Sequence, residues 1–213
     1  MNTNLMTNAI STTENVRYEQ IIDDLVTQKF SIVDAFFPSE LVSELRQNLK
    51  IKYKQDDLKK AAIGNRVNEA IIKNIRGDFI RWIDEKNADK TESQFFEHIN
   101  NFIEYLNRTC FLGILHREFH YAVYPKGTFY KKHLDTFQND DRRKLSMVCY
   151  LNDENWSLKN GGELVLYPEN EDKITINPVP GRLVIFESQI LEHEVKPVKS
   201  SNRFSITGWL KTR

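Results

Sequence analysis

The sequence predicts a mainly β fold: a double-stranded β-helix, or jelly roll, supported by helices that precede it in the chain. Two observations carry this prediction. After Gly113, eight short strand-like runs follow one another with turn residues between them. Before that point lies a strongly amphipathic segment, whose apolar face needs a sheet to pack against. We therefore predict one domain over residues 15–213, with helical support over 15–112 and the jelly-roll core over about 113–213.

The first ninety residues are expected to hold two helices and two short strands. Residues 1–14 are polar and rich in Asn and Thr, which predicts a disordered tail. Helical spacing of apolar residues predicts a helix over 18–28, followed by a strand over 30–33. A second helix is expected to have Pro38 in its first turn. Its predicted buried stripe consists of Leu41, Leu45 and Leu49.

The strongest predicted helix spans residues 91–110. Thr91 and Gln94 have the spacing of a capping box at its start. The segment before it divides into a charged stretch, 55–74, expected as a mobile connection or partly formed hairpin, and a turn and strand over 75–83. The predicted apolar face of the long helix consists of Phe95, Ile99, Phe102, Ile103, Leu106 and Cys110.

Eight runs with alternating or apolar character predict the strands of the jelly roll. Turns rich in Gly, Pro, Asn and Asp divide them. The runs cover residues 118–124, 130–135, 144–151, 163–167, 173–176, 182–187, 193–197 and 204–210. We found no internal repeat and no low-complexity block in this part of the chain.

Composition argues against several classes of partner, although a local basic groove stays possible. Thirty basic residues balance thirty acidic ones, so no overall field favours nucleic acid or an anionic membrane. No apolar run reaches the roughly 20 residues of a membrane span, and the N-terminus lacks the features of a secretory signal. The two cysteines, Cys110 and Cys149, lie in apolar contexts and are expected as buried free thiols. These features predict a cytoplasmic protein.

The candidate site is built around His133 and Asp135. Two residues apart in an extended segment, they are expected to point to the same face of a strand. His193, from a distant strand, would complete a two-histidine, one-carboxylate set that leaves other coordination positions open. Such a set suits ferrous iron in oxygenases. Each of the three has an ordinary structural explanation when taken alone; their order and their setting among strands favour a joint metal site.

Arg203 is a second candidate for binding. Its guanidinium can form a bidentate, charge-assisted pair with a carboxylate. Strand alternation places Arg203, Ser205, Thr207 and Trp209 on one face, and Phe204, Ile206 and Leu210 on the other. The first set is polar for a barrel interior unless a ligand fills it.

Six motifs occur in order along the second half of the chain. They are Tyr124-Pro125 followed by Gly127, Tyr130-x-x-His133-x-Asp135, Tyr150-Leu151-Asn152, Gly161-Gly162-Glu163-Leu164, His193-Glu194-Val195 and the run 203–209. Together they resemble the iron(II)- and 2-oxoglutarate-dependent prolyl hydroxylases, in particular the oxygen-sensing HIF-type enzymes and their bacterial counterparts. Residues 75–83 are also similar to a segment of that group, so the resemblance covers about residues 75–210.

The resemblance implies a role for each matching residue. His133, Asp135 and His193 would bind iron. Arg203 would pair with the distal carboxylate of 2-oxoglutarate, and the hydroxyl of Tyr150 would donate a hydrogen bond to the same end. The pocket would be lined near the metal by Tyr124 and walled by Val148, Leu164, Val195 and Trp209, with Thr207 beside them.

The reaction implied is oxidative decarboxylation of 2-oxoglutarate by O₂, coupled to hydroxylation of a prolyl residue in a protein or peptide. Its cofactors would be Fe(II) and 2-oxoglutarate, with ascorbate as an auxiliary. From their position beside the site, residues 55–74 and 137–143 are candidate substrate lids. The collagen-type enzymes of the family are expected to have Lys where Arg203 stands, which argues against that branch.

Other interpretations remain open. The same chemistry could act on a free amino acid or another small molecule, because substrate choice resides in loops. A nucleic-acid demethylase of the superfamily is disfavoured, since a second arginine is expected six residues after the first, where Trp209 stands. A cupin would have a second histidine in place of Asp135. A non-catalytic jelly-roll binding module is the alternative from another class; it would have to bury the triad, Arg203 and Tyr150 without a ligand.

Overall fold

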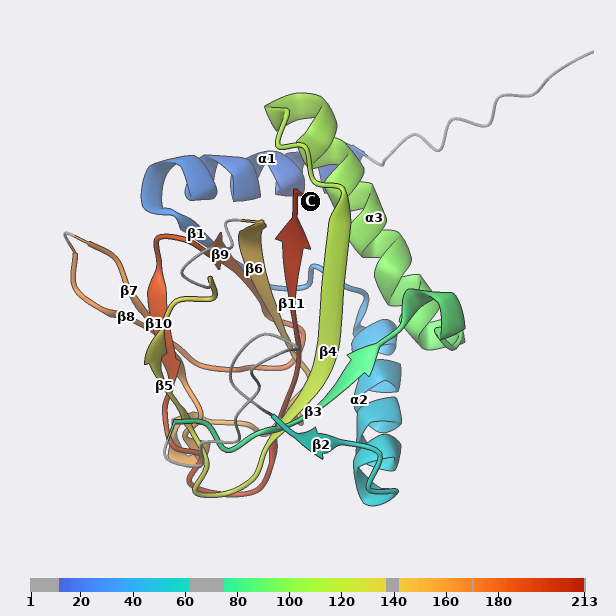
Figure 1. The fold of residues 1–213 in the computed structure, drawn as a ribbon, viewed down its shortest axis with the longest axis vertical. Helices are drawn as coiled ribbons and strands as arrows, with labels where there is room; N and C mark the ends of the chain where they lie inside the picture. The colour runs from blue at the N-terminus through green and yellow to red at the C-terminus, as the bar shows by residue number, and fades with distance from the viewer. Residues whose placement is uncertain (1–11, 62–74, 137–141, 170, 213) are drawn as a thin grey trace, which may run out of the picture.

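Two antiparallel sheets packed face to face form the body of the molecule (Figure 1). The computed structural model describes residues 12–61, 75–136, 142–169 and 171–212. The larger sheet has the strand order β1 (Phe30–Val33), β9 (Leu183–Glu187), β6 (Arg143–Tyr150), β11 (Arg203–Lys211), β4 (His116–Tyr124), β3 (Phe79–Ile83) and β2 (Lys59–Lys60). The smaller sheet has the order β5 (Tyr130–His133), β10 (Glu192–Val195), β7 (Leu164–Tyr167) and β8 (Ile174–Ile176). The predicted mainly β, jelly-roll architecture is confirmed.

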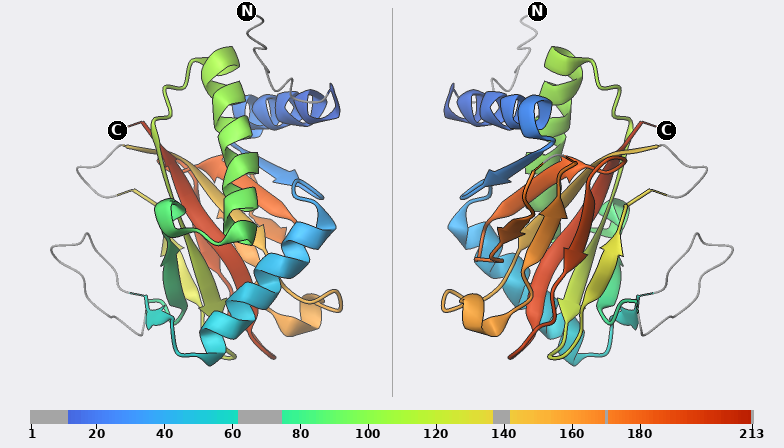
Figure 2. Two further views of the ribbon diagram at one scale, coloured as in Figure 1. Left: turned by 90° about the vertical axis from the view of Figure 1, so that its right-hand side faces the viewer. Right: turned by 90° about the vertical axis from the view of Figure 1, so that its left-hand side faces the viewer.

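Three α-helices in the described part of the chain lie on the outer side of the larger sheet, as both views in Figure 2 show. They are α1 (Thr12–Gln28), α2 (Ser39–Lys54) and α3 (Lys90–Cys110), and two short 3₁₀ turns, η1 (Glu85–Asn87) and η2 (Leu158–Asn160), lie in connections. Side chains from all three helices and from the outward face of the sheet form one apolar core. A second core fills the space between the two sheets. Among the described residues, no helix combines the length and apolar character needed to cross a bilayer.

Helix α3 has the predicted apolar face, but the helix begins at a different residue from the predicted one. Phe95, Ile99 and Phe102 are fully buried against the sheet. The capping box is formed by Asp89 and Glu92 rather than by the predicted pair: the Asp89 carboxylate accepts from Glu92 N at 2.9 Å, and Asp89 N donates to the Glu92 carboxylate at 3.1 Å. The helix therefore begins at Lys90, and the Thr91 hydroxyl, one residue inside, donates instead to Glu44.

The other helices also differ from prediction at their first turns. Helix α1 begins at Thr12, before the predicted end of the tail at residue 14; the remainder of that tail, residues 1–11, lies outside the described residues. Pro38 is the N-cap of α2 instead of a first-turn residue. The predicted stripe on α2 is confirmed, since Leu41, Leu45 and Leu49 are buried.

All eight predicted core strands are present, with ends within two residues of the predicted ones. The first half of the chain adds β1, β2 and β3 to the larger sheet, so its role is not helical support alone. The charged stretch 55–74 contains β2, which pairs antiparallel with β3, a strand outside that stretch. Residues 62–74 lie outside the described residues, so the expected hairpin or connection over 55–74 stays a prediction. Residues 137–141 of the second candidate lid also lie outside the described residues.

Strand β11 has the predicted two faces. Phe204, Ile206 and Leu210 point into the helix-side core. Arg203, Thr207 and Trp209 point between the two sheets and line a cavity there. Both cysteines are free, as expected, but only Cys149 is buried; Cys110, in the last turn of α3, is partly exposed.

Candidate active site

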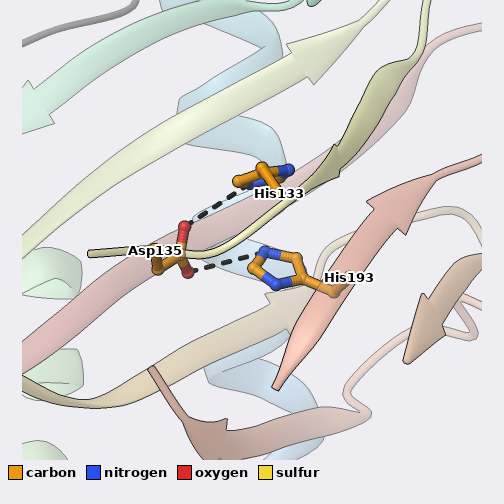
Figure 3. A group of neighbouring side chains, drawn as sticks. All are labelled: His133, Asp135 and His193. Carbon is orange, nitrogen blue, oxygen red and sulfur yellow. Dashed lines mark ion pairs between the residues drawn. The ribbon is translucent and has the colours of Figure 1, made fainter. Parts of the chain in front are cut away.

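His133, Asp135 and His193 come together at the open edge of the space between the sheets (Figure 3). Nε2 of His133 lies 3.5 Å from one carboxylate oxygen of Asp135, and Nε2 of His193 lies 3.5 Å from the other. All three potential ligand atoms are within 4.8 Å of one another. A set of two imidazole nitrogens and one carboxylate, close enough to share one metal ion, is a donor set suited to Fe(II).

Backbone carbonyls fix the orientation of both imidazoles. Nδ1 of His133 lies 2.6 Å from the carbonyl oxygen of Lys131, and Nδ1 of His193 lies 3.2 Å from that of Leu191. With Nδ1–H donating to a carbonyl, Nε2 keeps its lone pair for a metal. The strands also set the approach of the two rings, because His133 on β5 and His193 on β10 are register partners.

Asp135 does not lie on the strand with His133, which corrects the prediction that the two share a strand face. Strand β5 ends at His133, and Asp135 sits in the bend that follows. Its carboxylate is held by the hydroxyl of Ser146 at 2.7 Å, and its backbone carbonyl by the guanidinium of Arg143 at 3.0 Å. Ser146 itself contacts the hydroxyl of Ser188 at 2.8 Å. The bend, and not strand alternation, therefore brings the carboxylate to the histidines.

The protonation states favour metal binding. Burial alone would raise the pKa of Asp135, but the nearby His193 and hydrogen bonds from His133 and Ser146 outweigh it and hold the pKa well below its usual range. Burial lowers the pKa of His193 to about 4, against the opposing effect of Asp135. A carboxylate and a neutral imidazole are the forms that bind a metal ion.

A cavity of about 600 Å³ extends inward from these three residues. Apart from Tyr150, all residues predicted to line the pocket contribute to its wall: Tyr124, Val148, Leu164, Val195, Arg203, Thr207 and Trp209. Tyr150 is completely buried behind Arg203, with its ring 5.0 Å from the guanidinium carbon. Its hydroxyl has no hydrogen-bond partner among the described residues, and burial raises its pKa while Arg203 opposes that rise.

Arg203 is a buried cation in the wall of the cavity, with only 1% of its surface exposed. Its Nε donates to the carbonyl of Gly162 at 2.9 Å and its Nη1 to the hydroxyl of Ser205 at 3.3 Å. The guanidinium carbon lies 5.0 Å from the ring centroid of Tyr124 and 5.0 Å from that of Tyr150. Within the described part of the chain no carboxylate pairs with it, so its remaining donors and its charge are left for an anionic ligand.

Gly162 provides the space for this arginine. Its φ is +73°, and a Cβ at this position would lie 2.8 Å from Cδ of Arg203. A side chain here would therefore be strained and would also displace the guanidinium. The Gly161-Gly162 turn is visible in the sequence, but its contact with residue 203 depends on the tertiary fold.

Several residues of the site have no assigned role in the sequence interpretation. Arg76 forms a bidentate pair with the buried Asp78, at 2.8 and 2.6 Å. The guanidinium of Arg76 covers the ring of Tyr130 at 4.4 Å, and that ring stacks on His133 at 3.6 Å. The resemblance of segment 75–83 to the prolyl-hydroxylase family was the sequence feature that could have indicated a role for Arg76 and Asp78. The sequence contains no comparable feature that indicates a role for Ser146.

Comparison with known proteins agrees with this geometry. The family model described as "2OG-Fe(II) oxygenase superfamily" matches residues 119–211. The crystal structure of a Pseudomonas putida prolyl-4-hydroxylase superposes with a TM-score of 0.82 and is 35% identical, covering 92% of this chain and 99% of that one. The chain belongs to the 2OG-Fe(II) oxygenase superfamily, and within it the chain is similar to proteins named prolyl hydroxylases.

Two further relatives come from animals. A Trichoplax adhaerens prolyl hydroxylase, solved with a peptide of the hypoxia-inducible factor oxygen degradation domain, has a TM-score of 0.79 and 28% identity over 96% of this chain and 94% of that one. The "Hypoxia-inducible factor prolyl hydroxylase" of Caenorhabditis elegans is 30% identical over 202 residues, 90% of this chain. The chain spans 28% of the length of that curated relative.

Proposed function

We propose that this protein is an Fe(II)- and 2-oxoglutarate-dependent dioxygenase that hydroxylates a prolyl residue in a protein or peptide. The observation that carries the proposal is Arg203, a buried cation without a carboxylate partner among the described residues, inside a cavity whose edge holds two histidines and a carboxylate. A buried, unpaired charge costs several kcal/mol, so its retention is best explained by an anionic ligand.

The proposed iron ligands are His133, Asp135 and His193. Their support is the donor set, the hydrogen bonds that free both Nε2 atoms, and the ionised state of Asp135. Bound iron would supply the oxidative chemistry, in which decarboxylation of 2-oxoglutarate to succinate and CO₂ is coupled to insertion of one oxygen atom into a C–H bond.

The protein's own side chains would bind and orient 2-oxoglutarate. Arg203 would form the charge-assisted pair with the distal carboxylate, and the unpartnered hydroxyl of Tyr150 would turn toward the same end. Tyr124, whose ring is 5.0 Å from the guanidinium carbon, would line the pocket near the metal. The remaining wall would exclude water from the reacting atoms; it consists of Val148, Leu164, Val195, Thr207 and Trp209.

The choice of a prolyl residue as the target is supported by the three relatives described above, all of which are named prolyl hydroxylases. The name of one includes the hypoxia-inducible factor, and another was solved with a peptide of that factor. A free amino acid is the competing target. We also propose ascorbate as an auxiliary reductant and a cytoplasmic location. The latter is supported by the two free cysteines, which suit a reducing compartment.

The first experiment is an anaerobic titration with Fe(II) and 2-oxoglutarate, followed by the weak visible charge-transfer band of the chelated metal. We expect the band in wild type and His116→Ala, its loss in His133→Ala, and a need for far more 2-oxoglutarate in Arg203→Ala. His116 is an exposed histidine at the start of β4 and serves as the matched control. Absence of the band in wild type would refute the oxygenase assignment.

The second experiment identifies the target. Succinate formation would be measured with proline-containing peptides and, separately, with free proline and other amino acids. A peptide that gains one oxygen atom on proline, in step with succinate, would support the proposal. Hydroxylation of free amino acids only would replace the prolyl-peptide target with a small molecule. Succinate that forms at the same rate with and without ascorbate over many turnovers would remove ascorbate from the proposal.

A further inference from the structure

Phe111, the residue that ends helix α3, stands where neither burial nor backbone preference explains it. Its side chain is 86% exposed, and its φ of +53° lies in the left-handed region. A bulky side chain is rare in that conformation, and Gly or Asn is the usual residue at such a helix end. An exposed aromatic ring kept at a strained position therefore suggests a role outside the folding of the chain.

Hydrogen bonds fix the loop that follows Phe111. Nδ2 of Asn107 donates to the carbonyl of Ile114 at 2.8 Å, and Oδ1 of Asn107 accepts from the N–H of the same residue at 2.7 Å. The N–H of Leu115 donates to the carbonyl of Lys211 at 2.9 Å. The side chain of Leu115 is itself 68% exposed. The loop thus presents its apolar side chains to solvent from a pinned backbone.

An open hollow of about 550 Å³ lies along the second half of α3, next to this loop. Phe111 follows two residues of its wall, Asn107 and Arg108, at spacings of four and three, so the ring continues the same face of the helix. This face belongs to the end of α3 that projects beyond the strands (Figure 2). In the described part of the chain, the hollow shares no residue with the wall of the active-site cavity. Its wall consists of Asn100, Ile103, Glu104, Asn107, Arg108 and, from β4, Arg117.

The hollow and the loop have unused polar groups. Oδ1 of Asn100 is a buried acceptor that has no hydrogen-bond partner among the described residues. The backbone N–H groups of Phe111 and Leu112 likewise donate to no described residue. Glu104 and Arg108 are four residues apart on α3, a spacing that suits an ion pair, yet neither is paired with a carboxylate or a cation in the described chain.

These groups become complementary when a second copy is placed with its α3 antiparallel to the first. In a two-fold arrangement that sets Glu104 of one copy against Arg108 of the other, both copies form the same ion pair. The same offset along the helix sets Asn100 against Leu112, so that the free acceptor meets the free N–H. The ring of Phe111 then meets the part of the hollow between Asn100 and Glu104. One register therefore satisfies the charges, the hydrogen-bonding groups and the apolar ring together.

We propose that this surface is an interface between two copies of the chain, in which each copy inserts its Phe111 ring into the hollow of the other. Because the ring and its receptor adjoin on one surface, the contact is isologous and closes as a dimer. A phenyl ring buries at most roughly 250 Å², so the two rings supply a minor part of the roughly 1,600 Å² of a stable complex. The dimer is accordingly weak and reversible, with a micromolar dissociation constant. The interface is independent of the proposed function.

Sedimentation velocity of the full chain at rising concentration tests the interface. The runs contain a reductant, because Cys110 is partly exposed and could form disulfide dimers. Phe111→Asn removes the ring and suits the left-handed φ. The charge variants are Glu104→Arg, Arg108→Glu and the two combined. The matched control is Val26→Asn, which removes a 68% exposed apolar side chain from α1, and thermal unfolding of each variant checks that it is folded.

We expect wild type and Val26→Asn to dimerise with the same dissociation constant. Phe111→Asn should raise that constant about a hundredfold, because two apolar rings stay in water. Each single charge variant should raise it about tenfold, since both ion pairs become like-charge contacts. The double variant should recover most of the wild-type affinity. General surface stickiness would not produce this recovery.

Three results would overturn the inference. One is a wild-type protein that stays monomeric at every concentration, which would leave the surface to a partner other than a second copy. Another is a dimer that Phe111→Asn does not weaken, which would place the contact on a different surface. The last is a double charge variant that dimerises no better than the single ones, which would refute the antiparallel register. The oxygenase assignment stands in all three cases.

Discussion

Two arginines in the wall of one cavity, Arg203 and Arg76, have opposite electrostatic surroundings. Arg76 is held by both oxygens of the buried Asp78, which outweighs the effect of burial and raises its pKa. Arg203 is more deeply buried and has only neutral partners, namely a carbonyl, a hydroxyl and two aromatic rings. Under the proposed function, the paired arginine acts in structure, whereas the unpaired one binds the anionic co-substrate. The two arginines are distinguished by the presence or absence of a carboxylate partner, and not by burial or residue type.

The largest expected effect on ligand binding is at Arg203. Arg203→Met should weaken 2-oxoglutarate binding by about a hundredfold or more, because a buried, charge-assisted pair is lost. The same variant should not lower the melting temperature of the ligand-free enzyme, since it removes a buried charge that has no carboxylate partner. Both quantities can be measured by thermal unfolding with increasing 2-oxoglutarate. A variant that unfolds earlier without ligand, yet binds normally, would mean that Arg203 is structural.

Asp78 should show the opposite behaviour. Asp78→Asn leaves Arg76 buried without a counter-charge and should cost about 3–5 kcal/mol of unfolding free energy. Its matched control is Asp34→Asn: Asp34 also receives two hydrogen bonds from one arginine, Arg182, but is exposed. That change should cost less than about 1 kcal/mol. Urea unfolding of both variants tests the difference, and equal losses would contradict the structural role assigned to the Arg76 pair.

His120 is a third buried side chain in the wall of the same cavity, and burial keeps it uncharged instead of a partner balancing its charge. Its pKa of about 4 in the folded state lies below the ordinary value of 6.5 in the unfolded chain. The unfolded chain therefore binds more protons between these values, so stability falls as the pH drops from 6.5 toward 4. The loss from this residue should be about 3 kcal/mol. Denaturant unfolding of the metal-free protein across this range should show a shallower pH dependence in His120→Leu than in wild type; parallel curves would refute it.

The smallest effect is expected at Gly162, and it sharpens the description of the Arg203 end. Gly162→Ala combines a positive φ with a contact of 2.8 Å to Arg203. Gly113→Ala shares the positive φ, at +63°, but has no atom within 4 Å of the added carbon. Both should lose about 1 kcal/mol of stability from the strained φ. Gly162→Ala alone should also weaken 2-oxoglutarate binding severalfold, as measured by titration. Equal binding in both variants would show that Gly162 does not affect ligand binding through Arg203.

Much of the fold could be predicted because local patterns and long-range packing agree. The alternation in β11 predicted which residues face the helices and which face the cavity, since side chains in a strand must alternate. The apolar stripes of α2 and α3 predicted the buried faces in the same way. Helix starts were less predictable: several polar residues near the start of α3 have cap-like spacing, and the position of the whole helix selects the pair Asp89 and Glu92.

The sequence by itself determined the residue types of the site, His133, Asp135, His193 and Arg203, and the jelly-roll order of the strands that present them. Only the tertiary structure decided how Asp135 turns to the histidines, that Tyr150 lies behind Arg203, and that Arg203 has no carboxylate partner in the described chain. It also decided that His120 lies beside two tryptophans, with its Nδ1 unpaired among the described residues. The reason is physical: the presence or absence of a partner depends on contacts between residues far apart in the chain, and those contacts exist only once the sheets have packed.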